Sequence, residues 1–355
     1  MSDGTATRRR GLTTTHKRLL GAAGSIAVVV LVFVFVLPRI ADYRDVLDVL
    51  GGLGWRDWVV LVAAVLLNLA TFPPPWMAAL PGLGYREGMA MTQASTALSI
   101  VSPAGAAVGM AASYSMLRSW RFGAGAVGLA VAITGVWNQF ANLLFPVVAL
   151  ALLTAANEQH PALQTAALVG LTVLIVALSG FALMLSRPAR ARRIGDLAAR
   201  LASRSLRVVR RGPVSWGGES FAGFRSRALG LLRRRWHIIT VTTLAGHLTV
   251  FVLLLVCLRA VGIAGAEVTV VEAFAAWALV RILGALPLTP AGVGVVEVGL
   301  TGALVAFGAP NAEAVAATLL YRALTVLPTL ALGLLAAATW RTHQPGESIE
   351  SPSDP

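Results

Sequence analysis

The chain has 355 residues, of which 57% are hydrophobic and only 13% are charged. This composition excludes an ordinary soluble domain and is typical of a membrane protein with several transmembrane segments. The formal net charge is +13, and a single cysteine excludes both a disulfide framework and a thiolate metal site.

The N-terminal part predicts a membrane anchor. Residues 1–18 are polar and basic, which is typical of a cytoplasmic tail. Residues 19–37 form an apolar run that is long enough to span a bilayer. The run lacks a clear small-residue cleavage site and is too long for a signal-peptide core, so we expect it to be retained. Residues 39–53 have partial helical periodicity and predict a helix along the membrane interface.

A second span and a first helical hairpin follow. The second span covers residues 58–80 and is interrupted by three consecutive prolines at 73–75. Residues 89–101 and 103–117 are both apolar, and Pro103 and Gly105 separate them. Because proline disfavours helix at the residue before it, the sequence predicts a hairpin with a broken tip.

Two further spans precede a long basic segment. The first, at residues 124–153, carries three side-chain amides, Asn138, Gln139 and Asn142. Amides at lipid depth more often connect helices than bind ligands, so we interpret these as interhelical contacts. The next span, at residues 163–185, is uniformly apolar.

The segment from 186 to 236 is strongly basic. It contains fourteen arginines against two acidic residues, a net charge of +12. Ile194, Leu197 and Leu201 recur at helical spacing among these arginines, which predicts an amphipathic helix on an anionic membrane surface. A nucleic-acid partner is not expected, because the segment lies between two spans and carries no recognition motif.

The most unusual chemistry lies between residues 286 and 300. Apolar runs at 268–285 and 293–307 flank a stretch that contains Pro287 and Pro290. A continuous helix through this stretch is disfavoured. Broken backbone at lipid depth persists only where protein or water satisfies its polar groups.

One carboxylate and two arginines lie near this break. Glu297 follows it, Arg281 precedes it, and Arg322 lies within the last span at residues 314–338. Charged side chains at such depth are costly, so each is expected to have a partner or to face a polar cavity. Two interpretations stay open: a site for a phosphate headgroup, or a structural arginine–glutamate pair.

The two breaks share a short motif. Ser-Pro-Ala-Gly at 102–105 corresponds to Thr-Pro-Ala-Gly at 289–292. Proline-broken segments at corresponding positions of two halves are typical of transporters with inverted repeats. We therefore predict an all-α polytopic membrane protein with about six spans and two broken, re-entrant hairpins. The fifth span, at 237–258, precedes the second hairpin, and the sixth, at 314–338, follows it.

The charge distribution predicts the orientation. Arginine is concentrated in the N-terminal tail and in the 186–236 loop, so we expect both termini and this loop to be cytoplasmic and the protein to lie in the plasma membrane. The predicted transmembrane domain covers residues 19–340. Residues 341–355 are polar and acidic and predict a disordered tail.

The second break resembles the transmembrane region of lysylphosphatidylglycerol synthases, a family of flippase-like membrane proteins. The resemblance is carried by Pro287, by the break at Pro290 and Gly292, by the Gly-x-x-Glu from Gly294 to Glu297, and by Arg322 in the last span. It covers roughly residues 20–340. An earlier proline–glycine break also occurs in that family. The residues that this resemblance and the charge argument mark as a substrate site are Pro103, Gly105, Arg281, Pro290, Gly292, Gly294, Glu297 and Arg322.

The resemblance implies translocation of a phospholipid or a lipid-linked glycan, and we expect the lipid partners to be anionic or polyprenyl-linked. The synthases also carry a soluble aminoacyl-transferring domain, for which this chain has no room, so we expect no enzymatic activity. A membrane-embedded transferase and a non-transporting partner of a lipid- or glycan-modifying enzyme stay open as alternatives. No P-loop is present, and we expect no cofactor.

Overall fold

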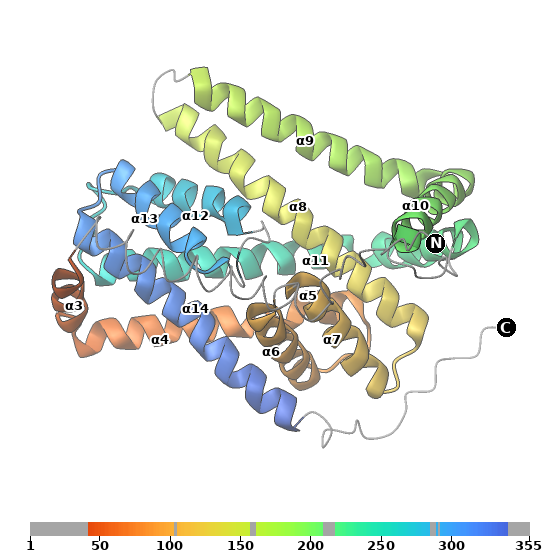
Figure 1. The fold of residues 1–355 in the computed structure, drawn as a ribbon, viewed down its shortest axis with the longest axis horizontal. Coiled ribbons are helices and arrows are strands. Elements are labelled where there is room, and N and C mark those ends of the chain that lie inside the picture. The colour runs from red at the N-terminus through yellow and green to blue at the C-terminus, as the bar shows by residue number, and fades with distance from the viewer. Residues whose placement is uncertain are drawn as a thin grey trace, which may run out of the picture.

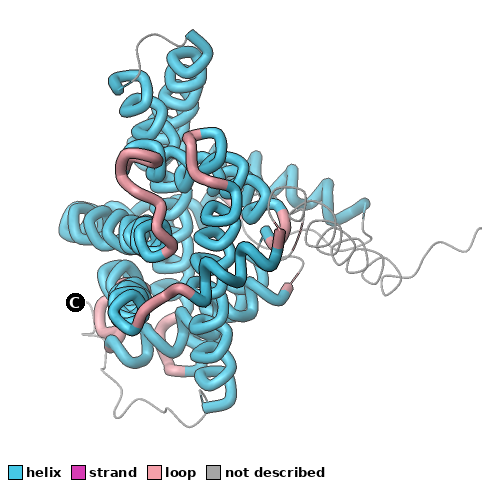
Figure 2. The backbone as a smooth tube through the Cα atoms, turned by 90° about the vertical axis from the view of Figure 1, so that its left-hand side faces the viewer, coloured by secondary structure: helices cyan, strands magenta, loops and turns pink. Residues whose placement is uncertain are grey.

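Every element that the structure describes is an α-helix, and the helices are joined by loops (Figure 2). The computed structural model describes residues 42–102, 105–156, 161–208, 217–284, 289 and 292–339. The expected anchor at 19–37 and both tails lie outside these ranges. In chain order the helices are α3 (Tyr43–Gly51), α4 (Trp55–Ala70), α5 (Pro73–Ala79), α6 (Tyr85–Val101), α7 (Gly105–Ser119), α8 (Ala124–Ala156), α9 (Pro161–Ser186), α10 (Pro188–Val208), α11 (Gly218–Ala260), α12 (Val270–Gly284), α13 (Val295–Ala306) and α14 (Asn311–Thr339).

Five helical segments in the described residues are long and apolar enough to cross a membrane. They are α4 with α5, α8, most of α9, α11 and α14. The predicted all-α polytopic class is therefore confirmed. The second span is interrupted just before the three prolines, between the end of α4 and the start of α5. The prolines themselves form the first turn of α5, where proline is tolerated.

The remaining apolar helices form two short hairpins. Helices α6 and α7 have 17 and 15 residues, and α12 and α13 have 15 and 12. At about 1.5 Å per residue even the longest is only about 26 Å, short of the roughly 30 Å hydrocarbon core. Figure 1 places α6 and α7 in one half of the molecule and α12 and α13 in the other. This arrangement fits two re-entrant hairpins that approach from opposite ends.

The two hairpins are packed reciprocally. Helix α14, which follows the second hairpin, packs on α6 of the first, while α8, which follows the first hairpin, packs on α12 of the second. The helices that precede the hairpins, α4 with α5 and α11, pack on each other. Exchanging the two halves therefore reproduces these pairings, as an internal repeat requires.

Part of the core lies between α8, α11 and α12. Phe145, Phe251, Phe274 and Trp277 form one aromatic cluster with ring centroids 5.2–6.0 Å apart. Edge-to-face and tilted contacts of this kind add to the free energy gained from burying the rings. The cluster packs α12 against the two long spans α8 and α11.

Helices α10 and α11 account for the described part of the basic segment. Helix α11 begins at Gly218, well before the expected span, and α10 packs on this extension. A Cβ at Gly195 would lie only 2.8 Å from Phe221, so glycine permits the close approach of the two helices. Leu197 and Leu201 lie on another face and are 53% and 54% exposed. The side chain of Ile194, the third predicted member of this stripe, lies outside the described residues.

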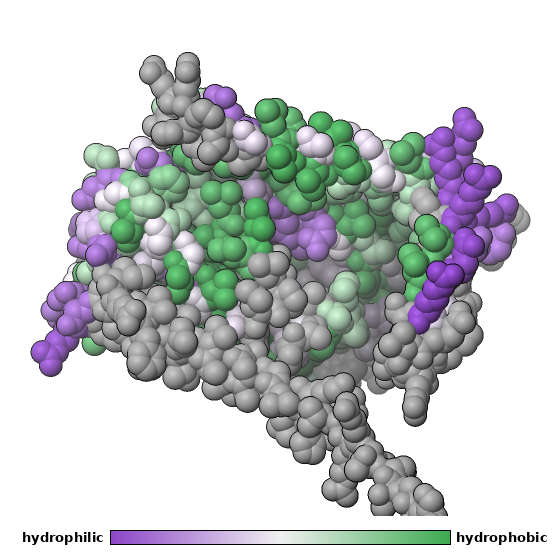
Figure 3. Space-filling view, turned by 45° about the horizontal axis from the view of Figure 1, so that its top comes forward, coloured by the Kyte–Doolittle hydropathy of each residue, from purple (hydrophilic) through white to green (hydrophobic). Residues whose placement is uncertain are grey.

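The outer surface is divided by polarity. On the face shown in Figure 3, apolar side chains surround a hydrophilic patch near the centre, and strongly hydrophilic side chains gather at the α10 end. Helix α8 carries exposed amides, Asn138 and Gln139, near the middle of its 33 residues. Polar groups at mid-span therefore interrupt a surface that is otherwise suited to lipid.

Candidate functional site

The second break is organised by two glycines in the left-handed region of backbone conformation. Gly292 has φ of +67° and Gly294 has φ of +87°. A Cβ at Gly292 would lie 2.8 Å from the Val296 side chain and 3.3 Å from the Gly284 backbone. Glycine is therefore required for both conformation and space where the break passes the end of α12. Pro287 and Pro290 lie outside the described residues.

Glu297 closes the N-terminus of α13. Its Oε2 accepts a hydrogen bond from the Gly294 backbone N–H at 2.6 Å, and its Oε1 accepts one from Arg322 Nε at 2.7 Å. The residue is only 3% exposed. The first N–H groups of a helix have no partner within the helix, so this carboxylate stabilises both the helix start and a cation on α14.

Arg281 lies in the last turn of α12 and reaches two other helices. Its Nη2 donates to Asn142 Oδ1 on α8 at 2.6 Å and lies 2.7 Å from His247 Nδ1 on α11. The guanidinium stacks on Trp277 at 4.8 Å from the ring centroid, which adds a cation–π contact. Arg281 Nε is buried and has no hydrogen-bond partner in the described part of the chain.

The contact with His247 fixes the form of the imidazole. Arginine has only donors, so His247 Nδ1 must accept, and its proton is on Nε2. The ring is therefore neutral in this arrangement. A neutral imidazole, an amide and an indole surround the cation, and none of them compensates its charge. Among the described residues, the ion pairs within 4.0 Å leave Arg281 without a carboxylate partner.

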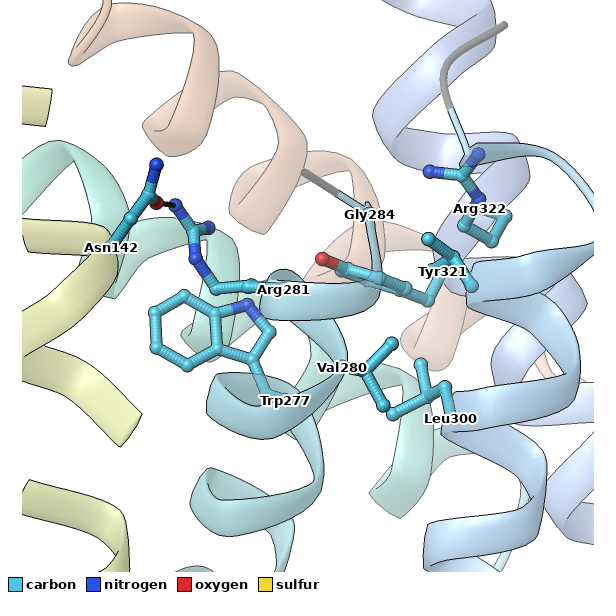
Figure 4. A pocket seen from close by; sticks show the side chains of 9 residues that line it. Asn142, Trp277, Val280, Arg281, Gly284, Leu300, Tyr321 and Arg322 are labelled. Carbon is cyan, nitrogen blue, oxygen red and sulfur yellow. Dashed lines mark hydrogen bonds between the residues drawn. The ribbon is translucent and has the colours of Figure 1, made fainter. Parts of the chain in front are cut away.

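A cavity of about 280 Å³ lies beside this arginine (Figure 4). Arg281 and Asn142 form one wall, and Arg322 lies across the cavity on α14. The Tyr321 hydroxyl points toward the Arg281 side in this view. The other lining residues are Trp277, Val280, Gly284, Val296 and Leu300.

A second cavity of about 380 Å³ also reaches Arg281. Its walls come from α5, α7, α8 and α11 and include the polar side chains of Thr71, Thr134, Asn138 and His247. Helix α7 of the first hairpin contributes Met110. The side chain of Arg281 therefore lies where two cavities with different helical walls meet.

The predicted site residues are not all brought to one place: Gly292 and Gly294 shape the break itself and line neither cavity. Arg281 and Arg322 lie on one cavity, while Glu297 is buried against Arg322 and is not among the residues that line that cavity. Gly105 accepts a hydrogen bond from Ser99 Oγ at 2.8 Å within its own hairpin and lies on neither of the two cavities. Pro103 and Pro290 lie outside the described residues.

Several members of the site were not predicted from the sequence. His247 and Trp277 lie inside expected apolar segments, and nothing in their spacing distinguished them from core residues. Asn142 was interpreted as an interhelical contact, which it is, but it also lines the cavity. A histidine in the middle of a span was the one signal available for His247.

The arrangement suits binding of an anion better than acid–base or metal chemistry. No group of three or more His, Cys, Asp or Glu side chains is close enough to hold a metal in the part of the chain described. What the site offers is a cation with neutral partners and a free donor, adjoining polar space. A planar guanidinium matches the oxygens of phosphate and carboxylate groups.

The fold and this site define a polytopic α-helical membrane protein with two opposed broken hairpins and a partly buried cation. The chain belongs to the family of the lysylphosphatidylglycerol synthase transmembrane region, whose sequence model matches residues 22–333. This match confirms the resemblance that the second break indicated. Comparison with curated protein sequences gave no match.

Proposed function

We propose that this protein translocates an anionic lipid, and that Arg281 binds the phosphate of its headgroup within the membrane. The observation that carries the proposal is the environment of Arg281. Its guanidinium is held by Asn142, His247 and Trp277, which are all neutral. A charged side chain at lipid depth costs about 2.5–3.5 kcal/mol on insertion scales, so an anionic ligand would offset a cost that these residues leave uncompensated.

The cavities support a path rather than a closed pocket. One is bounded by α8 and the second hairpin with α14, and the other by α5, α7, α8 and α11. Because both reach Arg281, a headgroup that enters through either one meets the same guanidinium. The opposed hairpins support this function as well, because broken helices that meet near mid-membrane commonly form the substrate sites of transporters.

Arg322 has a supporting role in this proposal. It lies on the cavity that Arg281 lines, but Glu297 already offsets its charge. Its N–H groups other than Nε add positive potential on the far wall. Arg281 is therefore the primary ligand of the phosphate, and Arg322 with Glu297 shapes the wall opposite.

The test is translocation of fluorescent phosphatidylglycerol in liposomes that contain the full-length protein, with phosphatidylcholine as the zwitterionic comparison. We expect Arg281→Gln to reduce phosphatidylglycerol translocation to the protein-free rate while the protein stays folded. Arg227→Gln, which changes an exposed arginine of α11 remote from both cavities, should leave the rate unchanged. Wild-type translocation by Arg281→Gln would refute the proposal.

A further inference from the structure

A third cavity, of about 450 Å³, lies between α8, α9 and α11. Its walls are almost entirely apolar and include Trp137, Phe140, Leu178, Phe181 and Leu244. Three of these form an aromatic cluster with ring centroids 5.6–6.0 Å apart. We call this cavity the α8–α9 crevice.

The polar groups of the crevice wall are mostly satisfied within the protein. Trp137 Nε1 donates to Thr240 Oγ1 at 2.8 Å, and Thr240 Oγ1 in turn donates to the Trp236 backbone carbonyl at 2.7 Å. The indole therefore presents its ring, and not a free donor, to the crevice. A space lined in this way suits hydrocarbon and offers little to a polar solute.

The outer wall of the crevice faces the membrane. Helix α9 packs on α8, yet only 11% of its most apolar stretch is buried. Leu178 is 43% exposed, while Val176, on another side of the helix, is 65% exposed. Hydrocarbon chains of the bilayer would thus lie directly against this helix, next to the crevice.

One side chain connects the crevice with the cavities at Arg281. Thr243 lines both the α8–α9 crevice and the cavity that includes His247 and Arg281. Its Oγ1 is buried without a hydrogen-bond partner among the described residues. From the α8–α9 crevice to the Arg281 guanidinium, the lining of the cavities therefore changes from apolar to mixed to polar.

We infer that the α8–α9 crevice holds a hydrocarbon chain of the anionic lipid whose headgroup binds at Arg281. This inference rests on the proposed function and narrows the substrate to amphiphiles with a long chain, as opposed to free phosphate compounds. The order of the cavities matches such a molecule, because a cation for the headgroup lies at one end and an apolar cavity for the chain lies at the other. Thr243 lies where the glycerol or first chain carbons of the lipid would pass.

The experiment compares two anionic lipids that share a headgroup, dipalmitoyl and dihexanoyl phosphatidylglycerol, binding to the full-length protein in neutral detergent. Ala182→Trp fills the crevice from α9, where the residue is exposed and lines the wall. We expect it to weaken binding of the dipalmitoyl lipid by about tenfold or more and to leave the dihexanoyl lipid unaffected. Val176→Trp adds the same indole on α9 outside the crevice and should change neither affinity.

The outcomes separate the two proposals. Unchanged dipalmitoyl binding by Ala182→Trp overturns the chain site but leaves the headgroup site standing. Unchanged dihexanoyl binding by Arg281→Gln overturns the headgroup site itself. If Ala182→Trp and Val176→Trp weaken binding of the dipalmitoyl lipid equally, the crevice is not a chain site. The same holds if Ala182→Trp alters only the self-association of the protein.

A second measurement needs no variant. Phosphatidylglycerol with a photoreactive group at the end of one chain should cross-link wild-type protein at residues that line the crevice, such as Phe140 and Leu144 on α8 or Leu178 and Ala182 on α9. Excess dipalmitoyl phosphatidylglycerol should compete. Cross-links confined to outward-facing positions such as Val176 would overturn the inference.

Discussion

Arg322 and Glu297 form a buried ion pair across α14 and α13, with Nε and Oε1 2.7 Å apart. Their side chains are 16% and 4% exposed, so water screens the pair only weakly. Because Glu297 also accepts from the Gly294 N–H, one carboxylate connects the break, the start of α13 and the last span. The pair therefore fixes the second hairpin against α14.

Removing one member of this pair should destabilise the protein. Glu297→Gln leaves Arg322 buried beside a neutral amide, and we expect a loss of about 3 kcal/mol in the free energy of unfolding. Glu297→Leu with Arg322→Met should recover most of that stability. Thermal unfolding in detergent measures both. Translocation by this double variant should be lower than that of the wild type, because the variant removes Arg322 from the cavity wall. Full translocation activity would show that the pair has only a structural role.

His247 should position Arg281 through a neutral acceptor. His247→Leu removes the acceptor, and since a hydrogen bond to a charged group contributes about 1.5–3 kcal/mol, we expect translocation to fall by at least about tenfold. His247→Gln retains an acceptor oxygen and should restore most of the rate. Equal loss in both variants, with unchanged thermal unfolding, would contradict a positioning role.

Gly333 should be essential to the contact between α14 and α6. A Cβ at this position would overlap the Ala97 side chain and lie 2.6 Å from the Gln93 carbonyl oxygen. We expect Gly333→Ala to destabilise the protein by about 1–3 kcal/mol, measured by thermal unfolding. The control is Gly302→Ala on α13, where a Cβ meets nothing within 4 Å and alanine should be neutral or stabilising. Similar unfolding temperatures for the two variants would contradict this packing argument.

The exposed face of α10 should bind anionic lipid. Four arginines, Arg190, Arg193, Arg200 and Arg204, are exposed on the helix that also exposes Leu197 and Leu201. Replacing all four with Gln in a peptide of residues 188–208 should weaken binding to vesicles rich in phosphatidylserine, by about 1 kcal/mol per charge at low salt. Phosphatidylcholine vesicles serve as the control. A parent peptide that ignores anionic vesicles would exclude this surface role.

Orientation is testable by labelling. Because the net +12 segment resists translocation, we expect both termini and residue 210 to be cytoplasmic. An impermeant thiol reagent added outside intact cells should modify His160→Cys but not Arg210→Cys. The native Cys257 is buried and gives little background. Modification of Arg210→Cys alone would reverse the assignment.

Hydropathy and helix breakers predicted most of the fold. The observed bounds of α8, α9 and α14 lie within three residues of the expected spans. Helix α11 is the main difference, because its start at Gly218 precedes the expected span at 237. Hydropathy marks where a helix enters the apolar region, whereas a polar, arginine-rich helix can extend beyond it.

The site was predicted only in part, because its partners depend on helix rotation. Charges within apolar runs identified Arg281, Glu297 and Arg322, but the sequence left open which arginine would meet the carboxylate. That choice depends on how α13 turns relative to α12 and α14, which periodicity does not determine. His247 became recognisable only once packing placed its Nδ1 against Arg281.

The exchange of packing partners between the halves has a consequence for assembly. A chain that ended after α9 would leave α6 without α14, and a chain that began at α11 would leave α12 without α8. Each half thus supplies the helix on which the hairpin of the other half packs. The first hairpin therefore gains its α14 contact, and the cavity beside Arg281 gains its Arg322 wall, only after the last span has been made.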